Sequence, residues 1–176
     1  MIAAALVNGM GPQAEPEVWR KLSTLYRVNF GLIRRVPVFA RVAAALMRRS
    51  VNSEKGFLLR RLAVRLPAED QRIMEHSRME AELNEAIVES LRLGSSGTIQ
   101  DLPVFARPWG FRFEEVSVPV LLWHGTEDAH TPIVIGRFVA ERIPGCQATF
   151  LEGAGHLWLF ENFDTVFDAL TKQAVV

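Results

Sequence analysis

The feature that most constrains the fold is a β-α-β pattern between residues 116 and 160. Val118–Trp123 is an apolar run of strand length, and Gly125 ends it where a chain leaving a sheet needs a sharp turn. Pro132 opens a helical stretch, and a second short strand, Gln147–Glu152, follows that helix. Strands connected through a crossover helix run parallel, so the pattern predicts an α/β fold with a parallel sheet.

A carboxylate and an imidazole follow these two strands. Asp128 lies just past the turn after the first strand, and His156 ends the loop Gly153–His156 after the second. Because parallel strands end at the same edge of a sheet, where open α/β sheets place their chemistry, we expect Asp128 to orient and charge-stabilise His156. Their hydrogen bond should be ~2.6–3.2 Å long. His124 and His130 are interpreted as a strand-end residue and a surface residue.

The stretches Pro119–Asp128 and Gly153–His156, separated by a helix, resemble the C-terminal part of the α/β-hydrolase fold, whose triad runs nucleophile, acid, base along the chain. The resemblance implies Asp128 as the acid and His156 as the base of an enzyme that hydrolyses an ester, amide or similar bond. It also implies that Ile2–Val7 is the sixth strand of the fold, followed by the seventh and eighth. Strands one to five would be absent, so the resemblance predicts an N-terminally incomplete hydrolase with about three parallel strands.

The nucleophile of such an enzyme is not identifiable. The G-x-S-x-G elbow, a strand followed by a strained turn and a helix, is absent from the sequence. Ser96 precedes Asp128 and His156 in the right order, but a charged helix comes before it and Gly97 is adjacent, where an elbow needs a strand and glycines two residues away. We therefore expect no activity from this chain alone. A non-catalytic binding module that keeps the hydrolase C-terminal fold is the alternative.

The order of elements divides the chain into two parts. Residues 1–11 and 112–176 are predicted to form the C-terminal part of the hydrolase core, and residues 12–111 a helical cap or lid insertion with its return segment. Proline positions and apolar periodicity predict helices within this insertion over Glu17–Arg35, Pro37–Arg49, Ser53–Leu66, a stretch that opens at Pro67, His76–Leu93 and Asp101–Arg107.

Charge is uneven within the insertion although the whole chain has no net charge. Residues 20–65 hold twelve Lys or Arg and one acid, a net of +11, whereas residues 66–93 hold seven acids and three Arg, a net of −4. The basic stretch could face an anionic membrane surface or an acidic substrate, but a solvated helix face, partly balanced by the acidic helix, is the interpretation that charge runs usually support. Nucleic-acid binding is not indicated, because no base-stacking aromatics alternate with the basic residues.

Several other classes of protein receive no support. The single cysteine, Cys146, excludes an internal disulfide and favours a reducing compartment, and no run approaches the ~20 apolar residues of a membrane span, so a cytoplasmic location is expected. No cofactor is expected: the turn Asn8–Pro12 lacks the Lys of a phosphate-binding loop and the third Gly of a dinucleotide fingerprint, and no residues have metal-ligand spacing. The expected partners are a small-molecule substrate, once upstream residues complete the site, and a second copy paired through the apolar edge strand Ile2–Val7.

Overall fold

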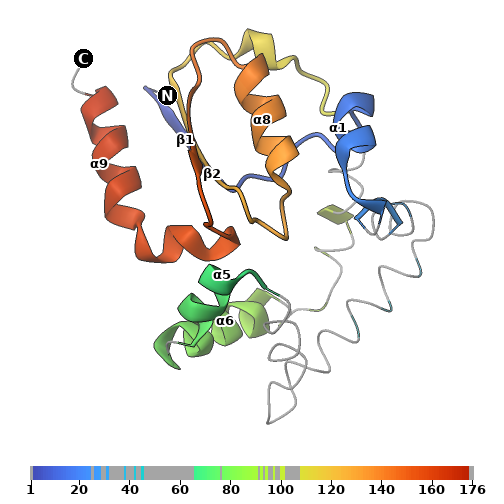
Figure 1. Cartoon of the computed structure of the whole chain (residues 1–176), viewed down its shortest axis with the longest axis vertical. Coiled ribbons are helices and arrows are strands. Elements are labelled where there is room, and N and C mark those ends of the chain that lie inside the picture. Colours follow the sequence, from blue (N-terminus) through green and yellow to red (C-terminus); the bar gives the residue numbers. More distant parts are fainter. Residues whose placement is uncertain are drawn as a thin grey trace.

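The computed structural model contains one small parallel sheet (Figure 1). Its strands are β1 (Ala4–Val7), β2 (Val120–Gly125) and β3 (Gln147–Leu151), and they lie in the order β1-β2-β3 with both pairings parallel. This confirms the predicted parallel sheet, with β2 beginning two residues later than predicted because Pro119 has no N–H to donate to a ladder. The structure describes residues 2–24, 66–75, 77–90 and 108–174, and single positions or short pieces at 26–28, 31, 38, 42, 45, 92, 94, 97, 100 and 101.

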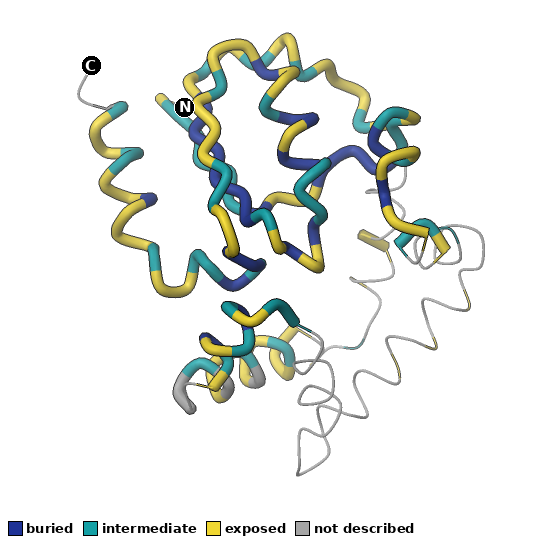
Figure 2. Tube along the Cα trace, viewed as in Figure 1, coloured by how far each residue is buried: buried dark blue, intermediate teal, exposed yellow. Residues whose placement is uncertain are grey.

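Two helices cover opposite faces of the sheet. Helix α8 (Ile133–Arg142) lies on one face and α9 (Phe163–Ala174) on the other (Figure 1). All six residues of β2 are buried, and the side chains of Val120–Trp123 alternate between two apolar clusters. Figure 2 shows this burial concentrated in β2 and the sheet-facing side of α8. An apolar central strand covered on both faces is typical of parallel sheets. The first cluster is centred on Val120, Leu122, Ile135, Phe138 and Val139, and the second on Leu121, Trp123 and Val166.

The helix predicted over Glu17–Arg35 is interrupted. Helix α1 (Pro16–Lys21) ends after six residues, because Leu22 turns to an extended backbone with ψ of 148°. The hydroxyl of Ser23 then accepts a hydrogen bond from the N–H of Tyr26, as an N-cap residue does at the start of a new helical segment. The prediction of one continuous helix was wrong at this point, since a local side-chain cap competes with helix continuation.

Further along the chain, helices α5 (Ala68–Met74) and α6 (Ser77–Ser90) confirm the two acidic helices predicted there. Apart from single positions, the predicted helices over residues 37–49, 53–66 and 101–107, and most of the basic stretch, lie outside the described residues. The chain returns through the 3-10 turn η1 (Phe113–Glu115), and a second one, η2 (His156–Glu161), follows β3. Helix α5 packs against η2 at the end of the sheet (Figure 1). Within the described ranges no helix is long and apolar enough to cross a membrane.

A glycine closes the central strand because there is no room for a side chain. A Cβ on Gly125 would lie 2.7 Å from the carbonyl carbon of Ala154 and 2.8 Å from the carbonyl oxygen of Gly155. Main-chain atoms cannot move aside cheaply, so Gly125→Ala is expected to lower the free energy of unfolding by about 3 kcal/mol. Gly9→Ala is the matched control, since a Cβ at Gly9 meets nothing within 4 Å. Urea unfolding of both variants checks this, and equal losses would contradict it.

Candidate active site

Asp128 is held in a fixed position just past the end of β2. Its side chain is fully buried. One carboxylate oxygen, Oδ1, accepts hydrogen bonds from the N–H groups of His130 at 2.8 Å and Thr131 at 2.7 Å. The other oxygen, Oδ2, lies 2.8 Å from Nδ1 of His156. The turn thus orients the carboxylate toward the ring, and the hydrogen bond predicted between Asp128 and His156 is confirmed.

His156 begins η2, directly after the loop that leaves β3. With Asp128 as the acceptor, Nδ1 carries the ring proton, so the lone pair of Nε2 is left for another group. The side chain is 37% exposed, and Nε2 has no hydrogen-bond partner among the described residues. Burial lowers the pKa of His156, but the hydrogen bond and charge of Asp128, together with the charge of Asp70, raise it above its ordinary value overall. This is the orientation and tautomer that a general base needs.

A residue that the sequence analysis missed, Asn8, ties together the ends of all three strands. It follows β1, is buried, and has a left-handed backbone with φ of 47°, which Asn adopts more readily than most residues. Its Nδ2 donates to the carbonyl oxygens of Gly155 and His156, both at 3.0 Å, and its Oδ1 accepts from the N–H of Gly125 at 2.9 Å. A polar residue at the end of an apolar strand was the only available signal.

Asp70 is the second residue that was missed. It comes from α5, is 0% exposed, and accepts hydrogen bonds from the N–H groups of His156 and Leu157, each at 2.9 Å. In the sequence it is one of two acids in the first turn of a helix, a position that the helix dipole explains by itself. The contact joins residues 86 positions apart, so no local pattern could indicate it.

The other two histidines differ in environment. His124 is buried within β2, and its Nε2 donates to the carbonyl oxygen of Thr131 at 2.7 Å; burial lowers its pKa. His130 is exposed, with its ring centroid 5.0 Å from that of His156; partial desolvation and the nearby His156 lower its pKa. Cys146 is a free thiol whose pKa burial raises. Across the described ranges no group of three His, Cys, Asp or Glu residues is placed to hold a metal ion.

The interaction between Asp128 and His156 should appear in the pH dependence of the unfolding free energy. Because the pKa of His156 is raised in the folded state, this residue stabilises the fold below its unfolded pKa, and the contribution is lost as pH rises through the folded pKa. Asp128→Asn removes the main cause. The difference in unfolding free energy between wild type and this variant is expected to be largest below about pH 6.5 and to shrink above it. Urea unfolding from pH 5.5 to 8.5 measures it, and a constant difference would contradict the assignment.

The described residues supply no third member of a triad. Ser96, the one serine that stands in a suitable order, lies outside the described residues. The hydroxyls of Ser23 and Ser90 cap or bond to their own helical backbone. Tyr26 contributes a hydroxyl that accepts from Gln13 Nε2 at 3.0 Å, and burial and the charge of Asp128 raise its pKa, which makes it a poor nucleophile. Among the described residues the site therefore holds the hydrogen-bonded pair of Asp128 and His156 without an identified nucleophile.

Comparisons with known proteins identify the fold. No family model and no curated protein matches the chain. Among solved structures, it is similar to a bromoperoxidase from Bacillus anthracis, with 19% identity and a TM-score of 0.60, over 99% of this chain and 58% of that one. An esterase from a Rhodococcus species gives 18% identity and a TM-score of 0.56, over 98% and 56%. An α/β hydrolase from a Medee basin deep-sea metagenome library gives 16% and 0.51, over 94% and 53%.

These likenesses agree with the observed topology. The chain spans a little more than half the length of the structures it matches, and nearly all of this chain is included in each match. The matched part contains three parallel strands in chain order, with helices on both faces. The chain therefore has the α/β-hydrolase fold, of which it forms a C-terminal portion.

Proposed function

We propose that Asp128 and His156 are the acid and base of a hydrolase that acts on an ester, amide or similar bond. The observation that carries the proposal is the 2.8 Å hydrogen bond between a fully buried carboxylate and a half-buried ring, with Nε2 left unpaired among the described residues. A buried acid that fixes the tautomer of a histidine whose other nitrogen is free is the arrangement that supports nucleophilic catalysis by a hydroxyl.

In the proposed mechanism, Nε2 of His156 takes the proton of a nucleophilic hydroxyl as the oxygen attacks the substrate carbonyl carbon. The imidazolium then gives this proton to the leaving group, and a water molecule deacylates the enzyme by the same route. Asp128 holds the ring throughout and stabilises its charged form. The nucleophile and the donors for the oxyanion come from outside the 176 residues, whose sequence contains no G-x-S-x-G elbow.

Reconstitution tests this proposal. The chain is fused to its in-frame upstream segment or, where the genome encodes none, to the N-terminal segment that the Bacillus anthracis bromoperoxidase has beyond the matched region. The fusion is expected to hydrolyse p-nitrophenyl esters, and His156→Gln is expected to reduce the rate at least about hundredfold. A folded fusion whose activity is unchanged by His156→Gln would overturn the proposal. Gly9→Ala is the control, since a Cβ at Gly9 meets nothing within 4 Å.

The second candidate is a non-catalytic interaction module that keeps the hydrolase fold. The absence of an elbow from the sequence is the observation that favours it. The genomic sequence upstream of the Met1 codon separates the two candidates. An in-frame strand, G-x-S-x-G turn and helix would support the hydrolase, whereas an immediate stop codon would support the module.

A further inference from the structure

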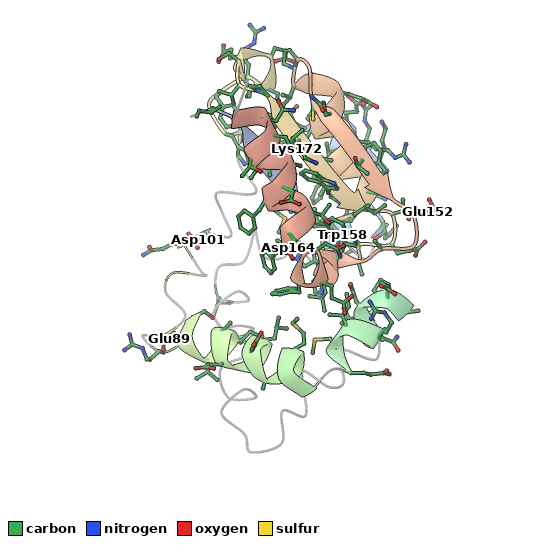
Figure 3. The ribbon with its side chains drawn as sticks, turned by 90° about the vertical axis from the view of Figure 1, so that its left-hand side faces the viewer. Glu89, Asp101, Glu152, Trp158, Asp164 and Lys172 are labelled. Carbon is green, nitrogen blue, oxygen red and sulfur yellow. The ribbon has the colours of Figure 1, made fainter. Side chains whose placement is uncertain are left out.

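Helix α5 contacts both ends of η2. At the first residues of η2, the carboxylate of Asp70 accepts hydrogen bonds from the N–H groups of His156 and Leu157, both at 2.9 Å. At the other end, Nη1 of Arg72 donates to Oε1 of Glu161 at 3.2 Å. The two contacts differ in environment: Asp70 is completely buried, whereas the Arg72–Glu161 pair is exposed to solvent, where ion pairs contribute little. Asp70 is therefore the contact that fixes η2. Figure 3 shows α5 directly below the turn that carries Trp158.

The chain makes room for this carboxylate. A Cβ on Gly155 would overlap both carboxylate oxygens of Asp70, so only glycine at this position lets the acid reach the main chain of His156. The first N–H groups of a helical turn have no partners within the turn and attract negative charge. A buried carboxylate needs such donors to offset its lost hydration. Asp70 thus gives the first N–H groups of η2 an acceptor, and these N–H groups offset the lost hydration of its carboxylate. The first of them belongs to His156, whose ring is bonded to Asp128.

We propose that Asp70 is a positioning residue for His156, acting through the main chain of η2 to hold the ring against Asp128. The inference rests on the proposed function and deepens it, because the base His156 would keep its position only while α5 is packed against η2. His156 is then held at two points, its ring by the acid after β2 and its backbone by the acid of α5. Release of α5 from η2 would loosen the base without touching Asp128.

Other charged groups around this contact are accounted for. Glu69 lies next to Asp70 on α5, but its side chain is partly exposed and pairs with Arg72. Asp128, in the turn after β2, is hydrogen-bonded to the ring of His156. His130 lies beside that ring. Desolvation and the nearby His156 lower the pKa of His130, whereas the charge of Asp70 acts to raise it. Asp70 and Asp128 are thus the two carboxylates whose negative charge favours the protonated ring of His156.

The test uses the whole chain and two mass-spectrometric readouts. Deuterium exchange at the ring C2 of His156 gives the pKa of that ring. Amide exchange in the peptide that contains His156 and Leu157 reports on the two hydrogen bonds that Asp70 accepts. Asp70→Asn is expected to lower the pKa and to speed amide exchange about five- to thirtyfold, the range that loss of a helix cap produces. Glu69→Gln removes a charge from the neighbouring position and is expected to change neither. Equal shifts in both variants, or none in Asp70→Asn, would overturn the inference.

A second variant covers the case in which Asp70→Asn unfolds the chain. Gly155→Ala displaces the carboxylate but keeps its charge, and is expected to speed the same amides while the peptide of β2 exchanges as in wild type. Combining it with Asp70→Asn should add little, since both variants remove one interaction. No local acceleration in Gly155→Ala would overturn the inference. A failure of the proposed function is distinguishable, because it would appear as a fusion whose esterase activity is unchanged by His156→Gln, whatever Asp70→Asn does to the pKa and amide exchange of the 176-residue chain.

Discussion

The 176-residue chain is expected to hydrolyse p-nitrophenyl esters no faster than a protein-free control. Asp128 and His156 are hydrogen-bonded at 2.8 Å, but the sequence contains no elbow to present a nucleophile. An acyl intermediate cannot form without one, and losing the nucleophile of a triad costs on the order of a millionfold in kcat. Release of p-nitrophenol by the purified chain, measured at several protein concentrations, checks this expectation.

Two variants show what any residual activity means. Activity that disappears in Ser96→Ala would contradict the prediction and identify Ser96 as the nucleophile. Activity that persists in Ser96→Ala and disappears in His156→Gln would come from the ring itself, since an imidazole with a free Nε2 can attack an activated ester slowly. Activity unaffected by both would be unrelated to this site.

The local pattern of the sequence was sufficient to predict the sheet and the contact between Asp128 and His156. Val120–Trp123 is an apolar run because the strand is buried on both faces, and that composition is visible in the sequence. Asp128 and His156 each follow a strand of the same β-α-β unit, so the parallel geometry alone brings them together. The hydrolase role of the pair came from a resemblance, and it remains a proposal.

The contacts that support the site could not be predicted, because they join distant parts of the chain. Asn8 bonds to the N–H of Gly125 and to two carbonyl groups after β3, and Asp70 reaches His156 from α5. Each residue has an ordinary local explanation, a turn for Asn8 and a helix dipole for Asp70. Such explanations hide a second role that only the packed chain reveals. The break in the helix at Leu22 was missed although its cause is local. The hydrogen bond of the Ser23 hydroxyl to the N–H of Tyr26 is only a weak signal in the sequence.

The prediction about association concerns the free edge of the sheet. The N–H groups of Ala4 and Asn8 donate to β2, to the carbonyls of Pro119 and Trp123, both at 2.9 Å. Because hydrogen bonding alternates along a strand, the N–H groups of Ala5 and Val7 point away from β2. In the described residues no strand pairs with that side. Ile2, 65% exposed, extends this apolar edge, which has none of the charges that usually protect one.

We therefore expect the chain to self-associate through β1, with an apparent mass above 19.8 kDa that rises with concentration in size-exclusion chromatography with light scattering. Ala5→Pro removes an outward N–H without removing a bond to β2, so it should shift the chain toward monomer. Ala5→Val keeps the N–H and is the control that should still associate. A concentration-independent monomer in which the amides of Ala5 and Val7 resist hydrogen exchange would contradict the prediction, because protected outward amides in a monomer require a partner from the same chain.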